Sequence, residues 1–264
     1  MKKIVLNLGI FLYSIFFISC TTVPGTGRTQ FAPIPSSQML HMSSKEYSKV
    51  LKSSKLSKDK KNTEMVKRVG KRIAKAVDDL LAEEGVEMKF DWEFNLIQDD
   101  KQANAWCMPG GKIAIYTGIL KYTKDETGLA VVMGHEVAHA VARHGNERMT
   151  QGIGLSLATV ALAISLNDQD PTTRNLFLSA FGAGAQVGIM LPFSRYQETE
   201  ADQLGLQLMA RAGYDPLASI EFWERMANSK GPKTPEFLST HPSHENRIEK
   251  LKEFIPEASI YYFP

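Results

Sequence analysis

His135-Glu136-Val137-Ala138-His139 places two histidines four positions apart. On a helix, residues four apart share one face and lie one turn apart, so both imidazoles can reach a single ion. Glu136 would lie on a neighbouring face, close enough to take the proton of a water held by that ion. This arrangement of two zinc-binding histidines and a glutamate base is typical of zinc peptidases.

The residues around this motif are uncharged, which indicates a helix that runs through an apolar interior. Two histidines and a glutamate are costly to bury there unless something satisfies them, and a metal ion would do so. We expect the helix to span about residues 125–144. Asp125 or Thr123 would cap its start, and Gly145 would close it.

A catalytic zinc usually has three protein ligands and one open position, so a third ligand must come from elsewhere. The candidates are His144, His241, His244 and an acidic cluster at residues 198–202. His144 follows on the same helix but is rotated away from the ligand face. His241 and His244 lie in a sequence that Pro242 keeps from being helical.

The acidic cluster offers the better geometry, because Glu198 and Asp202 are four residues apart on a predicted helix and share a face. Glu198 could bind the metal while Asp202 accepts the free N–H of a liganding histidine. Glu200 would point to the opposite side. The alternative is a helix start enriched in acidic residues by the helix dipole.

Four segments together resemble the M48 family of zinc metallopeptidases. They are the motif at 135–139, the segment Ser194–Gly205, Asn104-Ala105 followed by Pro109-Gly110-Gly111, and Thr240-His241-Pro242 with Arg247. The resemblance implies a zincin-like metallopeptidase domain with one Zn²⁺ per chain, held by His135, His139 and Glu198.

The same resemblance implies further roles. Asn104 and Ala105 would belong to the edge strand that binds substrate. His241 would either cover the zinc site or steady the oxyanion, and Arg247 would support the ligands together with Asp202. On the residues alone, His241 could equally be an exposed loop residue.

The N-terminus resembles a bacterial lipoprotein signal. An apolar run over residues 4–18 follows two lysines and ends at Ser19-Cys20, although Phe17 stands where leucine is usual. We expect residues 1–19 to be removed and Cys20 to be lipidated, with Thr21 favouring the outer membrane. The alternative is a plain cleaved signal in which Cys20 is incidental.

Residues 20–36 are rich in proline and glycine and read as a tether without regular structure. The domain would then cover residues 37–264. Within it we expect an α+β, mostly α-helical fold with one small sheet. The predicted helices are 37–54, 60–84, 195–212, 216–229 and 243–254, and the predicted strands are 88–98, 103–107 and 112–116.

Two apolar stretches, Gly152–Leu166 and Leu176–Pro192, follow the motif. Each is shorter than the roughly 20 residues of a spanning helix. Their many small residues permit close helix packing, so we expect a buried helical hairpin. Insertion into a membrane is the alternative.

The sequence therefore predicts a zinc endopeptidase that is lipid-anchored in the bacterial periplasm and cleaves misfolded or unassembled envelope proteins. The net charge of +2 gives no indication of nucleic-acid binding. Two alternatives remain open. One is a zinc-containing chaperone or assembly factor with little catalysis, and the other is a protease of the family's membrane-embedded branch.

Overall fold

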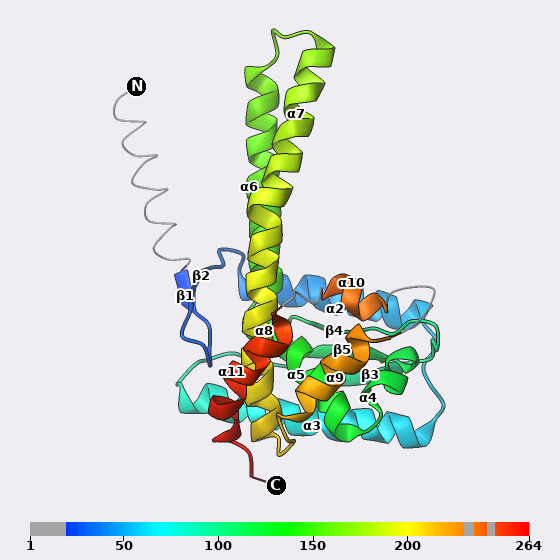
Figure 1. Cartoon of the computed structure of the whole chain (residues 1–264). Helices are drawn as coiled ribbons and strands as arrows, with labels where there is room; N and C mark the ends of the chain where they lie inside the picture. Colours follow the sequence, from blue (N-terminus) through cyan, green and yellow to red (C-terminus); the bar gives the residue numbers. More distant parts are fainter. Residues whose placement is uncertain (1–19, 230–234, 242–245, 264) are drawn as a thin grey trace.

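The computed structural model describes residues 20–229, 235–241 and 246–263 (Figure 1). The motif helix, α5 (Glu126–Val141), lies in the centre of the domain, and nearly all of its residues are buried. Asp125 caps it by accepting a hydrogen bond from the Gly128 N–H, as one of the two predicted caps. The predicted stop at Gly145 is wrong. The helix ends at Val141, Arg143 takes a left-handed conformation with φ of 54°, and α6 starts at His144.

A three-stranded sheet lies beside α5. Its order is β3 (Glu93–Ile97), β5 (Lys112–Tyr116), β4 (Ala105–Met108), with β3 parallel and β4 antiparallel to β5. The predicted strand 88–98 is regular only over β3. β4 lies at an edge of the sheet and contacts α5, so one strand with an open side runs next to the motif.

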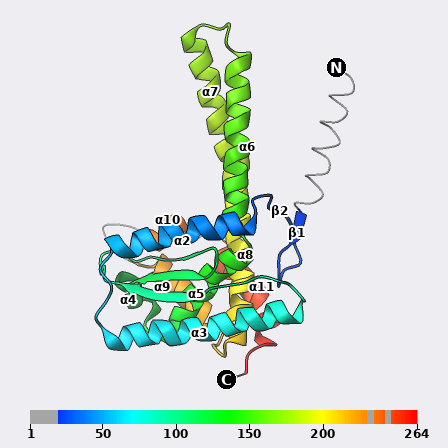
Figure 2. The same cartoon turned by 180° about the vertical axis from the view of Figure 1, so that it is seen from behind.

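Helices flank the sheet on either side (Figure 2). α2 (Ser36–Ser53) contacts β5, and α3 (Lys60–Glu83) packs on β3 and α5; both helices are within one residue of the prediction. The short helices η1 (Thr117–Ile119) and α4 (Leu120–Thr123) lead from β5 into α5.

The C-terminal helices complete the core. α8 (Leu191–Arg211) crosses α5, where Gly134 and Gly205 meet. A Cβ on Gly205 would lie 3.0 Å from the backbone nitrogen of His135, so only glycine permits this approach. α9 (Ala218–Ala227), the unpredicted α10 (Glu236–Thr240) and α11 (Arg247–Ser259) follow. The prediction of a mostly helical α+β fold is confirmed.

The predicted hairpin exists, but it is not buried. α6 (His144–Ser165), α7 (Pro171–Ala185) and a π-helical segment labelled η2 (Gln186–Met190) form a hairpin that projects from the domain (Figure 1). Ala185 is the one buried residue of α7. By length and composition, the continuous helix Pro171–Arg211 could cross a membrane. The prediction of burial was wrong because the two legs pack on each other and no further layer of the described residues covers them.

The segment after Cys20 is also ordered, against the expectation of an irregular tether. β1 (Cys20–Thr22) and β2 (Thr29–Phe31) form an antiparallel pair that turns through Gly25 and Gly27, both with positive φ. Val23 and Ala32 are buried. Residues 1–19, the predicted signal, lie outside the described residues.

Candidate metal centre

Four side chains converge where α5, α8 and the end of α10 meet. His135, His139, Glu198 and His241 each offer one ligand atom, and these atoms all lie within 4.8 Å of one another. His135, His139 and Glu198 are at most 5 % exposed. The convergence of two helices on one buried His/Glu group is consistent with the predicted zincin-like domain.

The spacing of these atoms fits a small tetrahedral cation. His135 Nε2 lies 3.2 Å from His139 Nε2, and each of these nitrogens lies 3.3 Å from an oxygen of Glu198. A tetrahedral ion with bonds of 2.0–2.1 Å, as Zn²⁺ forms with nitrogen and oxygen, sets its ligands about 3.3 Å apart. The three predicted ligands therefore already stand at the separations that zinc would impose.

Hydrogen bonding fixes the tautomer of His135. Its Nδ1 lies 3.0 Å from Oδ1 of Asp202, and the same oxygen accepts a 2.6 Å hydrogen bond from the buried Arg247. Since Arg247 keeps Asp202 ionised, the Nδ1–H of His135 donates to the carboxylate. Its Nε2 is left to face the centre. Asp202 and Arg247 thus lie where they were predicted.

His139 is held by a second chain of contacts. Its Nδ1 lies 2.7 Å from Nδ1 of His144, and Nε2 of His144 lies 2.8 Å from Oε2 of Glu200. Glu200 is ionised, because it also accepts hydrogen bonds from Arg28 and Thr26. His144 therefore donates from Nε2 and accepts at Nδ1, so His139 donates from its own Nδ1 and keeps a bare Nε2.

The two Nε2 atoms face each other across 3.2 Å in a buried site. Burial lowers the pKa of His135, but hydrogen bonds with Asp202 and Glu198 outweigh it and raise the pKa to about 9, so without an ion a proton on Nε2 of His135 can be shared with Nε2 of His139 or with Glu198. A metal ion would take the place of that proton and leave both imidazoles neutral. This donor set of two neutral imidazoles and a carboxylate is the one that zinc prefers in catalytic sites.

The carboxyl groups of the centre differ in their electrostatics. Burial raises the pKa of Glu198, but hydrogen bonds with His135, His139 and His241 outweigh it and hold the pKa well below its usual range. Burial instead keeps the pKa of Glu136 above its ordinary value, although Nε2 of His241 lies 3.2 Å from its Oε1. Glu198 is an anion suited to a metal, whereas Glu136 is suited to taking up a proton.

The chain was compared with known proteins. The model of the family described as "Peptidase family M48" matches residues 61–255, which is most of the chain. The chain belongs to peptidase family M48.

Relatives of this M48 chain carry protease names. It is 42% identical over 173 residues to the mitochondrial metalloendopeptidase OMA1 of Schizosaccharomyces pombe, covering 64% of this chain and 48% of that protein. It is 31% identical to the human metalloendopeptidase OMA1, over 96% of this chain and 49% of that protein. The beta-barrel assembly-enhancing protease of Escherichia coli is 27% identical, over 88% and 47% respectively. The chain spans about half the length of these relatives.

The remaining predicted residues of the M48 motifs also surround the centre. His241 places its Nδ1 3.1 Å from Nε2 of His135 and 3.0 Å from Glu198, and its Nε2 lies 3.2 Å from Glu136. Asn104 is buried at the start of β4, and its side-chain oxygen accepts the Ala105 N–H. His244 and Pro242 lie outside the described residues.

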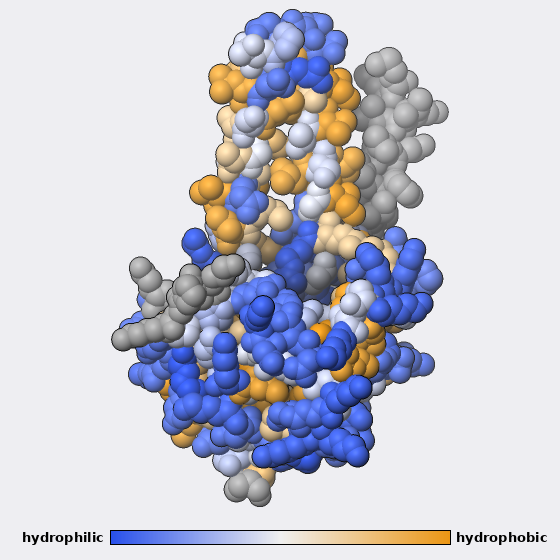
Figure 3. All heavy atoms as spheres, turned by 90° about the vertical axis from the view of Figure 1, so that its right-hand side faces the viewer, coloured by the Kyte–Doolittle hydropathy of each residue, from blue (hydrophilic) through white to orange (hydrophobic). Residues whose placement is uncertain are grey.

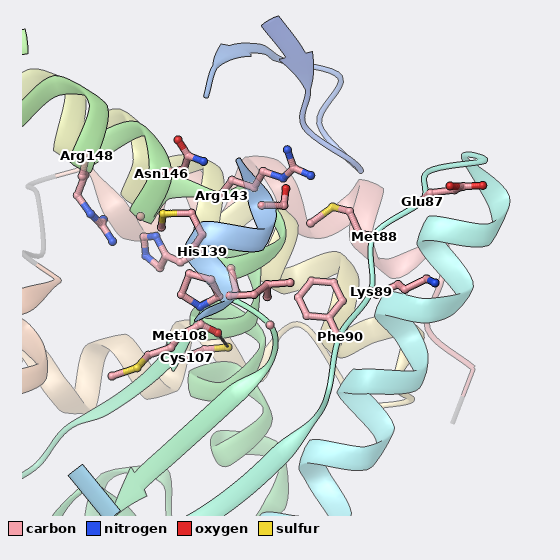
Figure 4. Close-up of a pocket in the computed structure, with 17 residues that line it drawn as sticks. Glu87, Met88, Lys89, Phe90, Cys107, Met108, His139, Arg143, Asn146 and Arg148 are labelled. Atoms are coloured by element: carbon pink, nitrogen blue, oxygen red, sulfur yellow. Dashed lines mark hydrogen bonds between the residues drawn. The ribbon is translucent and has the colours of Figure 1, made fainter. Parts of the chain in front are cut away.

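A pocket of about 330 Å³ opens beside His139 (Figure 4). Most of its lining is apolar and comes from α2, from the segment before β3 and from the end of β4: Met39, Leu40, Met88, Phe90, Cys107 and Met108. Arg143 and Arg148, at the start of the hairpin, also line it. Burial raises the pKa of the Cys107 thiol, so this side chain adds to the apolar surface as a neutral group.

Sequence reasoning missed three residues of the M48 site. It read His144 and Glu200 as turned away from the metal, which is where they lie, but not as the support of His139. It assigned Arg28 to an irregular tether. Glu200 could be recognised in the sequence as a member of the acidic cluster at 198–202, whereas nothing in the local sequence indicated that Arg28 would pair with it.

Proposed function

We propose that this chain is a zinc-dependent endopeptidase. The observation that carries the proposal is the close spacing of His135, His139 and Glu198, with the Nε2 atoms of both histidines turned inward at separations that suit a zinc ion. Zinc bound there supplies a Lewis acid that polarises the peptide carbonyl and acidifies the attacking water.

Glu136 is the general base. It takes a proton from the attacking water and returns it to the leaving amine, two steps that suit a buried carboxyl whose pKa is raised. The rival reading of a zinc-containing assembly factor gives Glu136 no task, since this residue is not needed to hold the metal.

Substrate would bind as an added strand along β4. The carbonyl of Asn104 accepts the Tyr116 N–H, so the Asn104 backbone faces β5. By alternation, the backbones of Ala105 and Cys107 face the open edge. An extended peptide there would run past His139, and the apolar pocket would take a large apolar side chain next to the cleaved bond.

His241 closes the centre in the conformation described here. Its Nδ1 lies 3.1 Å from Nε2 of His135 and 3.0 Å from Glu198, so its imidazole covers the side of the centre where water and substrate would have to enter. We infer that His241 must move out before water and substrate enter. Arg247 holds this segment through a 3.4 Å hydrogen bond to the carbonyl of His241.

The substrates that we propose are misfolded or unassembled proteins of the bacterial envelope, met by an enzyme in the periplasm whose Cys20 carries a lipid. Two observations support this. The cleft recognises an extended backbone and an apolar side chain, which folded proteins conceal. One relative is named for beta-barrel assembly.

The test compares purified wild type with Glu136→Gln on reduced casein and on a folded protein of similar size. Wild type should cleave casein at peptide bonds next to a large apolar residue, and it should leave the folded protein intact. In cells that express Glu136→Gln, unassembled envelope proteins should accumulate. Equal cleavage of folded and unfolded substrates, or an unchanged envelope proteome, would contradict the substrate class.

A further inference from the structure

Each leg of the α6–α7 hairpin contains a long run of uncharged residues. Between Arg148 and Asp168 there are 19 consecutive uncharged residues, and between Arg174 and Arg195 there are 20. At 1.5 Å per helical residue, these runs are about 28 and 30 Å long. The hydrocarbon core of a bilayer is about 30 Å thick.

Apolar side chains of the hairpin point into solvent in the isolated chain. Leu157, Ile164 and Leu176 are 66%, 70% and 69% exposed, and Val187 is 68% exposed. Figure 3 shows an apolar band along the hairpin between a hydrophilic tip and a hydrophilic domain. A helical pair standing in water would carry charged side chains on its outer faces, and this one has none.

Three hydroxyl groups of α6 within the band are satisfied by their own helix. Ser156, Thr159 and Ser165 donate to the carbonyls of Gly152, Leu155 and Leu162, at 2.8 Å each. Such back-bonding is how hydroxyl side chains meet their hydrogen-bond needs where water is absent. Of the amide side chains, Gln151 lies near the base of the hairpin, three residues after Arg148, and Gln186 is one exposed amide near the middle of the second leg.

Charges mark both ends of the band. Asp168, Asp170 and Arg174 lie at the tip, and Arg148 and Arg195 lie where the legs enter the domain. This order of charged end, apolar middle and charged end matches the headgroup, hydrocarbon and headgroup zones of a bilayer.

We propose that the α6–α7 hairpin inserts lengthwise into a lipid bilayer, with its tip in the far headgroup zone and the metal centre just outside the near surface. A second copy of the chain is the other candidate occupant. The absence of charge from every face of both legs favours lipid, because a dimer would cover only one face.

The position of the N-terminal strands agrees with this orientation. β1 starts at Cys20 and lies beside the base of the hairpin in both ribbon views (Figures 1 and 2). A lipid on Cys20 would therefore enter the same bilayer as the hairpin. The metal site and the pocket beside His139, whose lining includes Arg143 and Arg148, would then face chains that emerge from that membrane.

The test uses the full processed protein reconstituted into phosphatidylethanolamine–phosphatidylglycerol vesicles. An environment-sensitive fluorophore is placed on Val160→Cys in the middle of α6, or on Lys71→Cys on the exposed side of α3, both in a Cys107→Ser background. The unsubstituted Cys107→Ser protein serves as the labelling blank. Nitroxides at the middle of the lipid chains should quench roughly half of the Val160→Cys fluorescence and almost none of the Lys71→Cys fluorescence.

A second pair of variants separates insertion from folding. Val187→Lys puts a charge near the middle of the band and should abolish quenching at Val160→Cys, while Gln169→Lys puts the same charge at the tip and should leave it unchanged. Both variants should keep bound zinc. The proposal is overturned if the Val160→Cys probe stays open to aqueous iodide. It is also overturned if the probe is shielded from iodide but is not quenched by lipid, the result expected for a dimer.

Discussion

Arg28 and Glu200 are 172 residues apart in sequence and form a buried ion pair, with Arg28 Nε 2.8 Å from Oε2 of the carboxylate. The same Glu200 oxygen lies 2.8 Å from His144, which in turn contacts His139. The loop between β1 and β2 is thereby connected to a metal ligand through two side chains. The segment next to the proposed lipid site consequently helps to orient the metal centre.

Arg28→Gln should weaken zinc binding by roughly tenfold, at the low end of the range for residues that orient metal ligands. Without the guanidinium, Glu200 holds His144 less firmly, and the Nδ1–H of His139 loses its fixed acceptor. Competition with a fluorescent chelator measures the affinity. Arg68→Gln is the matched control, because it breaks an exposed Arg–Glu pair far from the metal. Equal zinc affinities of Arg28→Gln and Arg68→Gln would show that Arg28 does not influence the metal site through Glu200 and His144.

Glu200 should make stability depend on pH. Burial raises its pKa, but hydrogen bonds with His144, Arg28 and Thr26 outweigh this and lower the pKa to about 2. A carboxyl with a lowered pKa stabilises the fold above its ordinary pKa, and this contribution is lost as the pH falls toward 2. At 1.36 kcal/mol per pKa unit, it amounts to about 3 kcal/mol at neutral pH, and about 2 kcal/mol of it disappears by pH 3.

Denaturant unfolding in mild detergent measures the contribution of Glu200 to the free energy of unfolding. A chelator in the buffer removes zinc, so that metal binding does not affect the result. Wild type should lose more stability than Glu200→Gln between pH 6 and pH 3, and the two curves should converge at the acid end. Parallel curves would mean that the Glu200 pKa is not lowered in the folded state.

Gly205→Ala should destabilise the protein by about 1–3 kcal/mol, the usual cost of overpacking. The new methyl group would lie 3.0 Å from the His135 backbone nitrogen and push α8 away from α5. Glu198 would move from both histidines, so zinc affinity should fall as well. Gly145→Ala is the control, since its nearest neighbour would be 4.0 Å away in a helix that favours alanine. If Gly205→Ala left both the stability and the zinc affinity unchanged, the crossing of α5 and α8 would tolerate a larger separation than we expect.

His241→Ala should raise kcat/KM for a short peptide several-fold if the proposed gating is correct, because the imidazole lies against both Glu198 and Glu136. The control is His41→Ala, which removes an exposed histidine on α2. Activity measured at saturating zinc separates gating from metal loss. A fall in kcat with unchanged zinc content would instead assign His241 to the oxyanion.

Local spacing indicated which side chains of the candidate metal site share a helix face. The pairs His135–His139 and Glu198–Asp202 each share a helix face at four-residue spacing, so the geometry follows from the helix alone. The partners of His139 were not predictable in this way, because Arg28 reaches Glu200 only through tertiary folding. The placement of His241 and Arg247 depended on the family resemblance.

The hairpin shows a different limit. Runs of apolar residues predict that a helix avoids water, but they do not say whether protein or lipid covers it. The length estimate counted only the most apolar residues, Gly152–Leu166 and Leu176–Pro192, whereas the charge-free legs extend further at both ends. In the N-terminal segment, glycines read as breaks of regular structure are the turn residues of a strand pair.

The central claim is that zinc and Glu136 together cut peptide bonds, and the most direct measurement is casein cleavage by Glu136→Gln with its zinc content determined on the same sample. The variant should bind one zinc per chain and unfold at the wild-type temperature. Its cleavage rate should be at least about 100-fold lower, the minimum expected for loss of a general base. Cleavage at the wild-type rate by the zinc-loaded variant would contradict the account.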